Sequence, residues 1–367
     1  MHIAIFGAGI AGLMSAVTLR MQGHSCAIYE RSRVAHDAGM GFILMPEAIA
    51  CMDRLGIQLN GNCNGVPLDR YICRNSEGDV LYEEALPPRS RGIRRRELIG
   101  ALADAARVKD AISFNAELEW LEFDERGCVT TATLSSGERI TADLFVAADG
   151  ARSRGRQALF PNWPLDQARV AEVVGLSHCS ETTIWAGRNL NKFHAVDGGL
   201  AVGVLPVDAD HVVWFMQYDS LRFPPPCSRD ASSPEWRDFV QKLAGEWTSP
   251  IAHLLATTPP RLMHAWHPLD TDLVPYFHQQ NLVLVGDAAH PLSPFTSQGV
   301  SSAIADAVAL ADLLPSKKEN VALLEGLTAY SSQRRRQCAP YLNKGRELME
   351  KFLAPVNSAS FMLPLAR

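Results

Sequence analysis

A glycine-rich turn near the N-terminus constrains the fold more than any other feature of the sequence. Residues 2–6 form a short apolar run of strand type, and GAGIAG follows at once at residues 7–12. A helical pattern continues over 13–21, and CAIYE at 26–30 returns as a second strand. A strand, a tight turn, a helix and a second strand make a βαβ unit, which predicts a parallel sheet.

The glycines of this turn have separate physical tasks. Gly7 permits the tight turn, Gly9 lets a pyrophosphate approach the backbone, and Gly12 lets the helix and the strand pack closely. Glu30 ends the second strand, where an acidic side chain can accept hydrogen bonds from both hydroxyls of an adenosine ribose. The glycines alone would also fit a simple packing turn. Together with Glu30 they predict a dinucleotide site.

Composition and charge limit the classes of protein that the chain can belong to. It has 367 residues, 47% of them hydrophobic and 20% charged, which is enough for a large core in one domain or two interlocked domains. Its net charge of -5 disfavours nucleic acid and anionic membrane as principal partners. It contains no charge-free apolar stretch of about 18 residues, as a membrane span requires. We therefore expect a soluble protein.

The eight cysteines are scattered, without a close CxxC pair or a matching histidine cluster. This spacing signals neither a zinc site nor a disulfide framework. We expect no metal site, and a reducing cytoplasm is the simplest compartment.

Two kinds of pattern alternate along the chain. Residues 166–269 carry period-two strands such as LAVGVLPV and HVVWFMQY, which predict an antiparallel sheet with a hairpin, and helical patterns occupy most of 298–353. The predicted fold class is α/β, with a Rossmann-like parallel-sheet domain, an interleaved and mostly antiparallel second domain, and a helical C-terminus. The predicted boundaries are 1–70, 95–165 and 270–315 for the first domain, 71–94 and 166–269 for the second, and 316–367 for the C-terminal segment.

Three separated segments end apolar strands with Gly or Asp-Gly: the first glycine turn, AADGARSRGR at 147–156, and GDAAHPLSP at 286–294. In an open parallel sheet, ligands gather at the carboxyl ends of the strands, so all three segments could meet one extended dinucleotide. With this triple pattern the chain, over residues 1 to about 314, resembles the single-component FAD-dependent aromatic hydroxylases, which are p-hydroxybenzoate hydroxylase-like flavoprotein monooxygenases. The resemblance implies noncovalent FAD in the first domain and a substrate pocket formed by the second.

The resemblance also implies roles for individual residues. Asp149-Gly150 begins the DGxxSxxR pattern, which continues with Ser153 and Arg156 and is linked to FAD and to pyridine-nucleotide binding. Gly286-Asp287 matches the motif that holds the ribityl chain, and Pro294 stiffens a loop against the isoalloxazine ring. The implied cofactor-binding residues are Gly7, Gly9, Ala11, Gly12, Glu30, Arg31, Arg95, Asp149, Gly150, Gly286, Asp287, Gln298, Gly299 and Val300.

The helix that begins near Gln298 is expected to aim its first backbone N–H groups at the flavin N1–C2=O edge, where a reduced flavin is negative. Two residues depart from the family pattern. Ser297 stands where glycine is frequent and Ser301 where asparagine is frequent. Serine can still donate a hydrogen bond, so we expect flavin binding to be kept, whereas the resemblance does not carry over to flavin mobility and the substrate pocket.

Several polar residues have competing interpretations. His194 and Tyr218, beside the predicted second sheet, are candidate acids or bases, although either could instead serve in packing. Together with Pro294 they are the catalytic residues that we predict. For His290, hydrogen bonding to backbone is favoured over proton transfer. Arg95 is the arginine that reaches FAD, whereas a solvated face is favoured for its arginine neighbours and for 334–336.

The implied reaction uses NAD(P)H to reduce FAD, and O2 then forms a flavin C4a-hydroperoxide that hydroxylates an aromatic or similar electron-rich small molecule. NAD(P)H is expected to bind transiently, because there is no second GxGxxG motif. The alternatives are a related flavoenzyme (a reductase or a halogenase), a nicotinamide-dependent dehydrogenase and a non-catalytic flavin-binding or partner-binding module. A halogenase is disfavoured because the WxWxIP motif is absent. The expected assembly is a monomer or a homodimer.

Overall fold

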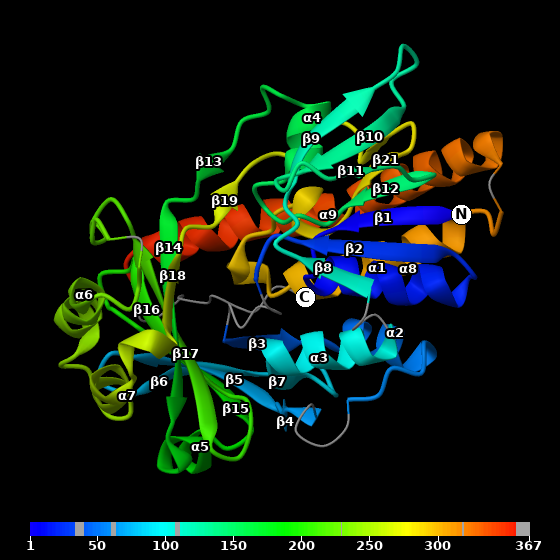
Figure 1. Cartoon of the computed structure of the whole chain (residues 1–367). Coiled ribbons are helices and arrows are strands. Elements are labelled where there is room, and N and C mark those ends of the chain that lie inside the picture. The colour runs from blue at the N-terminus through cyan, green and yellow to red at the C-terminus, as the bar shows by residue number, and fades with distance from the viewer. Residues whose placement is uncertain (34–39, 60–63, 107–110, 229, 318, 357–367) are drawn as a thin grey trace.

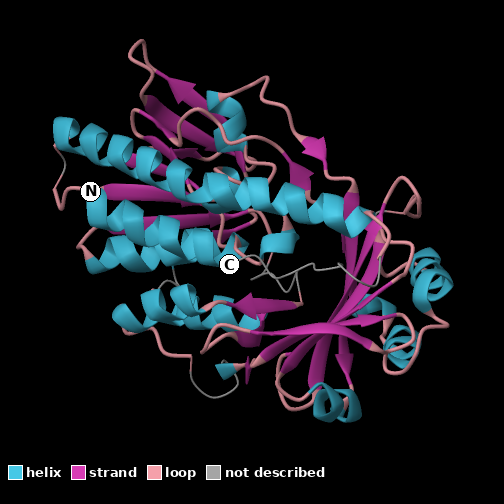
Figure 2. Cartoon of the chain, turned by 180° about the vertical axis from the view of Figure 1, so that it is seen from behind, coloured by secondary structure: helices cyan, strands magenta, loops and turns pink. Residues whose placement is uncertain are grey.

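The computed structural model describes residues 1–33, 40–59, 64–106, 111–228, 230–317 and 319–356. Two large sheets dominate it, and one long helix, α9 (Asn320–Leu353), runs from the first sheet to the second (Figures 1 and 2). The blue strands at residues 2–6 and 25–30 belong to the first sheet, and the green strands at residues 189–219 belong to the second (Figure 1).

The first sheet has six strands in the order β20-β21-β12-β1-β2-β8, and all neighbouring pairs except β20–β21 are parallel. Phe6 pairs with Ala147, and Ala147 pairs with Leu284. The carboxyl ends of β1, β12 and β21 are therefore in register, and the three following loops start side by side. The strands are β1 (His2–Phe6), β2 (Ser25–Glu30), β8 (Ile112–Phe114), β12 (Leu144–Ala147), β20 (His278–Gln279) and β21 (Leu282–Leu284).

Helices cover one face of this sheet, and α1 packs directly against α8 (Figure 2). Apolar side chains of β1, β12 and β21 meet those of α1 and α8 in the largest core cluster. The helices of this layer are α1 (Ile10–Met21), α2 (Pro46–Arg54), α3 (Arg95–Ala105) and α8 (Gly299–Leu313). A small three-stranded sheet and α4 (Arg154–Leu159) complete this half; its strands are β9 (Leu118–Phe123), β10 (Val129–Leu134) and β11 (Arg139–Ile140).

The second large sheet has seven strands in the order β18-β14-β17-β16-β15-β5-β6. All neighbours are antiparallel except β15 and β5, which are parallel although more than a hundred residues separate them. The strands are β5 (Arg70–Asn75), β6 (Val80–Ala85), β14 (Val170–His178), β15 (Asn189–His194), β16 (Leu200–Pro206), β17 (His211–Asp219) and β18 (Met263–Trp266).

The two faces of the second sheet have different neighbours. Trp214, Met216 and Tyr218 alternate along β17 and pack in one core cluster with α6 (Pro234–Ala244) and α7 (Ile251–Thr257). The opposite face carries Val170 and Ala201, which pack against η5 (Pro294–Thr296) and the end of α9. The second sheet thus contacts the loop that follows β21.

Short elements join the two halves. A three-stranded sheet has the order β3-β7-β4, and β13 pairs with β19. Their bounds are β3 (Gly41–Leu44), β4 (Val66–Pro67), β7 (Arg91–Arg94), β13 (Asp166–Gln167) and β19 (Leu269–Asp270). The other short helices are α5 (Ser180–Ala186), η3 (Pro260–Leu262) and η4 (Gly286–Ala288).

The predicted fold class is confirmed: a parallel sheet with helices, an interleaved antiparallel sheet and a helical C-terminus. The predicted hairpin is β16–β17. The first helix begins at Ile10, one turn earlier than the pattern from Leu13 indicated. The domain boundaries stay a prediction. Among the described residues, no helix is both long and apolar enough to cross a membrane.

Candidate functional site

The turn after β1 has no room for side chains at two of its glycines. Gly7 has φ +107°, and a Cβ there would lie 2.3 Å from the Ala148 carbonyl oxygen. A Cβ at Gly12 would lie 1.9 Å from the Gly7 oxygen. At Gly9, by contrast, a Cβ would meet no described atom within 4 Å. The turn therefore packs against the end of β12 and leaves open space at the glycine that we expect to face a pyrophosphate.

Glu30 is fixed beside this turn. Its two carboxylate oxygens accept hydrogen bonds from the backbone amides of Ala8, at 2.7 Å, and Ser32, at 2.9 Å. Burial alone would raise the pKa of Glu30, but the two amides lower it overall, so the side chain stays ionised at neutral pH. A fixed carboxylate with free lone pairs can accept hydrogen bonds from ribose hydroxyls. Arg31, the next residue, is exposed.

The loop after β12 is held by its own side chains and by an arginine. Asp149 accepts hydrogen bonds from the amides of Arg154 and Gly155, and Ser153 caps α4 by accepting from the Arg156 amide. Burial raises the pKa of Asp149, whose Oδ1 has no partner among the described residues. The DG motif thus presents a buried acceptor that the protein does not satisfy.

Arg156 connects this loop to the loop after β21. Its guanidinium is buried and donates to the carbonyl oxygens of Asp287 and Ala288, each at 3.0 Å. In this structure the arginine of the DGxxSxxR pattern therefore holds the two strand-end loops together.

The GD loop lies against the first helix. Gly286 has φ +59°, and a Cβ there would lie 2.7 Å from the Cβ of Ala11. The Asp287 side chain is accessible to solvent, yet desolvation by the protein around it raises its pKa. The positive charges of His290 and Arg95 oppose that rise. Arg95 Nε is buried and has no hydrogen-bond partner among the described residues. Asp287 and Arg95 therefore face the same part of the molecule with unused hydrogen-bonding capacity.

The segment from η5 into α8 leads through a left-handed residue into the first turn of a helix. Pro294 is the first residue of η5, and Ser297 then adopts a left-handed conformation with φ +53°. This geometry accounts for the frequent glycine at that position in the family that the sequence resembles. Gln298 precedes the first turn of α8, and a Cβ at Gly299 would meet no described atom within 4 Å. The buried Ser301 hydroxyl has no partner among the described residues.

The residues at the carboxyl ends of β1, β12 and β21 fit FAD. Three segments far apart in sequence meet at one sheet edge, open space adjoins Gly9 and Gly299, and the loops leave Asp149, Arg95 and Ser301 with unsatisfied buried polar atoms. Residues 1–343 match the family model described as FAD binding domain. The chain belongs to the FAD-binding domain family. The family, fold class and FAD cofactor predicted from the sequence are thereby confirmed.

Several relatives of this FAD-binding protein carry the names of hydroxylases or monooxygenases. An FAD-dependent urate hydroxylase of Mycolicibacterium vanbaalenii is 27% identical over 357 residues, with 95% of this chain and 87% of the relative covered. A 3-amino-4-hydroxybenzoate 2-monooxygenase of Streptomyces platensis is 29% identical, with 85% of this chain and 79% of the relative covered. They confirm the predicted enzyme class, an FAD-dependent monooxygenase.

Solved structures share the fold. Klebsiella pneumoniae HpxO complexed with FAD and uric acid superposes with a TM-score of 0.82 at 24% identity, covering 96% of this chain and 88% of that chain. CtdE in complex with FAD and its substrate superposes with a TM-score of 0.86 at 19% identity, covering 99% and 93%.

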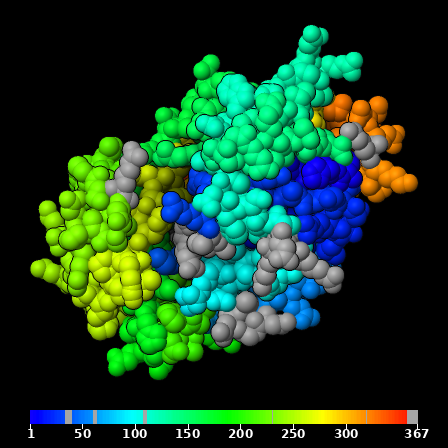
Figure 3. Space-filling view, viewed as in Figure 1, coloured from blue at the N-terminus to red at the C-terminus, as the bar shows by residue number. Residues whose placement is uncertain are grey.

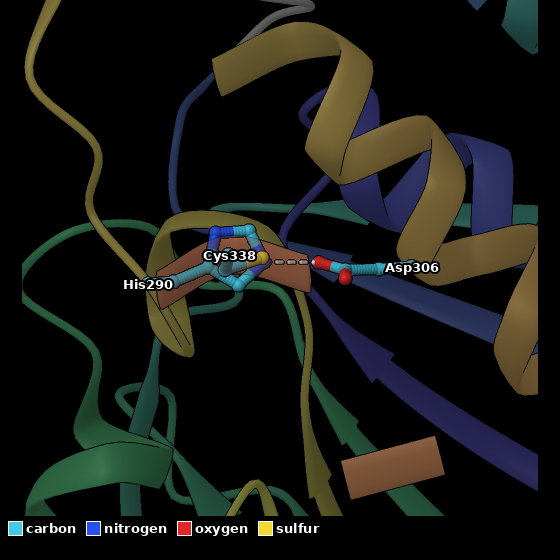
Figure 4. Close-up of side chains that lie close together, drawn as sticks. All are labelled: His290, Asp306 and Cys338. Atoms are coloured by element: carbon cyan, nitrogen blue, oxygen red, sulfur yellow. Dashed lines mark hydrogen bonds and ion pairs between the residues drawn. The ribbon is translucent and has the colours of Figure 1, made fainter. Parts of the chain in front are cut away.

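A buried charged cluster behind the GD loop was not predicted as a site. Asp306, in the middle of α8, accepts hydrogen bonds from the Gly286 amide, at 2.7 Å, and from Arg334 Nε, at 2.5 Å. His290 Nε2 lies 2.6 Å from the same carboxylate, and Cys338 lies beside the imidazole (Figure 4). An acid in the middle of the mostly apolar helical pattern of residues 299–313 was the sequence signal that could have found it.

This cluster corrects two interpretations of the sequence. His290 was expected to bond to backbone, but its Nε2 pairs with the Asp306 carboxylate, and although burial opposes protonation this partner raises its pKa well above the ordinary value. Arg334 was expected on a solvated face, but it is 4% exposed and ion-paired with Asp306. A helix face that packs against a carboxylate inside the protein cannot be distinguished from a solvated face by charge pattern alone.

The two candidate acid–base residues lie on opposite faces of the second sheet. His194 faces η5 and the end of α9, where its ring contacts Phe352. Burial, with the nearby charge of Lys192, lowers its pKa well below the ordinary value, so the imidazole is neutral. Tyr218 points to the other face and contacts Phe239 of α6. The structure does not bring Tyr218 to the strand-end loops. Trp214 is core, with its indole N–H bonded to Thr258.

Proposed function

We propose that this flavoprotein is an NAD(P)H-using hydroxylase of a small aromatic or heteroaromatic molecule. The observation that carries the proposal is the register of β1, β12 and β21, which starts the GxGxxG, DG and GD loops side by side. The hydroxylase and monooxygenase names of the relatives, which act on urate and on an aminohydroxybenzoate, support this class of substrate.

We propose that FAD lies along the carboxyl ends of these strands. Glu30 would accept from the ribose, the first turn would hold the pyrophosphate, and Asp287 would accept from the ribityl hydroxyls. When bound, FAD supplies the chemistry of hydride acceptance from NAD(P)H and of O2 activation. The residues that would hold it are Gly7, Gly9, Ala11, Gly12, Glu30, Arg31, Arg95, Asp149, Gly150, Gly286, Asp287, Gln298, Gly299 and Val300.

The protein contributes charge and shape to this chemistry. α8 has fifteen residues, and the positive end of its dipole would favour negative charge on the ring edge that faces Gln298. Pro294 would hold the ring from one side, and the face of the second sheet that carries His194 would close the pocket from the other. A closed, dry pocket slows the loss of activated oxygen as hydrogen peroxide.

Substrate-stimulated oxidation of NAD(P)H tests this function. We expect the purified protein to be yellow, to release free FAD on denaturation, and to consume NAD(P)H faster with a hydroxylatable aromatic compound from a panel of phenols, aromatic acids, indoles, purines and other heteroaromatics. The product should be one oxygen heavier by mass spectrometry. Halide incorporation, or reduction of a carbon–carbon bond without O2 uptake, would instead identify a halogenase or a reductase.

A further inference from the structure

Lys192 is a buried cation that the proposed function does not yet use. It lies on β15, is 6% exposed, and points to the face of the second sheet that contacts η5 and α9. A buried ammonium is costly unless it is paired or bound.

The neighbouring strand carries small residues beside this lysine. Lys192 pairs with Gly203 and its neighbour His194 pairs with Ala201, so the two β16 residues under the lysine are small. The side chain crosses β16 and donates to Gln217 Oε1 on β17, at 2.5 Å. At Gly203 a Cβ would lie 2.1 Å from the Phe215 ring, so a larger residue there would displace that ring.

Beyond Gln217 the series of hydrogen-bonded side chains continues to the carboxylate of Glu172. Gln217 Nε2 donates to Glu172 Oε1 at 2.5 Å, and Trp266 Nε1 donates to Glu172 Oε2 at 3.0 Å. The glutamine separates the lysine from the acid, so the ammonium has no direct ion pair among the described residues.

The Lys192 ammonium has unused hydrogen-bonding capacity. It carries three N–H donors, and Gln217 Oε1 is its single acceptor among the described residues. Three aromatic rings surround it: Phe295 at 5.3 Å, Phe352 at 5.6 Å and Phe215 at 5.9 Å. Phe295 directly follows Pro294, so Lys192 borders the loop that we propose lies against the flavin ring.

We propose that Lys192 binds an anionic group of the substrate, a ring carboxylate or an ionised ring oxygen, and so selects negatively charged aromatic molecules. The surrounding phenylalanines supply an apolar wall for the ring, and the ammonium supplies the charge. This inference rests on the proposed function, because it places the substrate between the second sheet and the flavin.

The titratable groups facing Lys192 determine how anion binding should depend on pH. These groups are Glu172 on β14, His194 on β15 and Cys73 on β5; the described η5 and α9 residues against it are phenylalanines. Burial lowers the pKa of Lys192 to about 8, opposed by Glu172. The ammonium is thus present below that pH and lost above it, so anion binding should weaken as pH rises.

The test compares matched probes that differ only in charge. Benzoate with benzamide, and indole-3-carboxylate with indole-3-carboxamide, would be titrated into the FAD-loaded protein by calorimetry and by the flavin absorbance change, between pH 6 and pH 10. None of these carboxyl or amide groups titrates in that range. In the wild type we expect a carboxylate to bind more tightly than its amide, and the preference to decline above about pH 8.

Two variants isolate the charge. Lys192→Met should weaken carboxylate binding by about tenfold or more, the effect of losing a charge-assisted hydrogen bond, and should leave amide binding nearly unchanged. Lys192→Arg should keep the preference and remove its decline at high pH, because arginine stays protonated. Lys242→Met, on the exposed side of α6, is the matched control and should change neither affinity.

The outcomes separate this inference from the proposed function. Equal losses for carboxylate and amide in Lys192→Met, or no carboxylate preference in the wild type, would overturn the role of Lys192, while substrate-stimulated hydroxylation could still stand. A protein that neither holds FAD nor consumes NAD(P)H would remove the proposed function as well.

Discussion

At the scale of single residues, the backbone of the strand-end loops decides which side chains the site tolerates. Ser297 has φ +53° and ψ +20°, which costs an L residue about 1–2 kcal/mol. Because η5 on one side and α8 on the other are well packed, the chain keeps this conformation. The serine therefore stores strain at the start of the helix that we propose faces the flavin.

Ser297→Gly should relieve that strain. Glycine adopts positive φ freely but loses more entropy on folding, so we expect a net gain in the free energy of unfolding of about 0.5–1 kcal/mol. Chemical denaturation of the FAD-free protein would measure it. Ser293→Gly, at φ -59°, is the matched control and should reduce stability. A loss of stability in Ser297→Gly would show that the serine hydroxyl matters more than the backbone.

Asp287→Ala should weaken FAD binding. The change removes the carboxylate that we propose accepts from the ribityl hydroxyls and leaves Glu30 intact. Loss of a charge-assisted hydrogen bond costs about 1.5–3 kcal/mol, or about 10- to 150-fold in affinity. Titration of FAD into the apoprotein would measure this, with the exposed Asp197→Ala as control. Unchanged affinity would remove Asp287 from the site.

At the scale of elements, α8 and α9 are joined by charge inside the protein. The Asp306 carboxylate on α8 binds Arg334 on α9 and also binds the Gly286 amide and His290 in the loop after β21. One side chain thus fixes two helices and the GD loop relative to each other.

The pH dependence of stability should reflect this cluster. Despite its burial, Asp306 has a lowered pKa because His290 and Arg334 face it, so its contribution is present above the unfolded value near 3.8 and is lost as pH falls. His290 has a raised pKa, so its contribution is complete below 6.5 and is lost as pH rises through the folded value. Denaturation across pH should show greatest stability between these limits.

Asp306→Asn should remove both pH effects and reduce stability. Breaking a buried pair by neutralising one partner costs about 3–5 kcal/mol, because Arg334 and His290 would lose their counter-charge. Asp312→Asn, at the exposed end of the same helix, is the control and should have little effect. A pH profile in Asp306→Asn that matches the wild type would show that other groups control stability.

The elements show what sequence could and could not predict. The βαβ unit and the β16–β17 hairpin were predictable because each depends on local periodicity and turn residues. The parallel pairing of β15 with β5 was not, since side-chain patterns do not identify distant strand partners. The glycines and Asp287 of the candidate site follow recognisable spacing. Asp306 and Lys192 gain their meaning from partners on other elements, which no spacing rule supplies.

At the scale of the whole molecule, the two large sheets form separate bodies that share a contact surface. On the face shown in Figure 3, the green and yellow residues of the second sheet and its helices lie on the left and meet the blue and cyan residues in the centre. η5 and the end of α9 pack on Val170 and Ala201 of the second sheet. Gly198, before β16, also approaches the Ala354 carbonyl oxygen after α9.

FAD should stabilise both bodies together. A ligand that binds only the folded state adds about 2.7 kcal/mol at a concentration one hundred times its Kd. Because α9 contacts both sheets, we expect calorimetry of the FAD-loaded protein to show one transition at a higher temperature than that of the apoprotein. Two separated transitions, of which FAD moves one, would show that the sheets unfold independently.

The order of strands in the first sheet also has a consequence for synthesis on the ribosome. β1 and β12 can pair once residue 147 has emerged, but β21 belongs beside β12 and is made more than a hundred residues later. At usual translation rates that interval is on the order of 10 s. During it the apolar edge of β12 has no native neighbour, so we expect the nascent chain, more than the finished protein, to depend on chaperones.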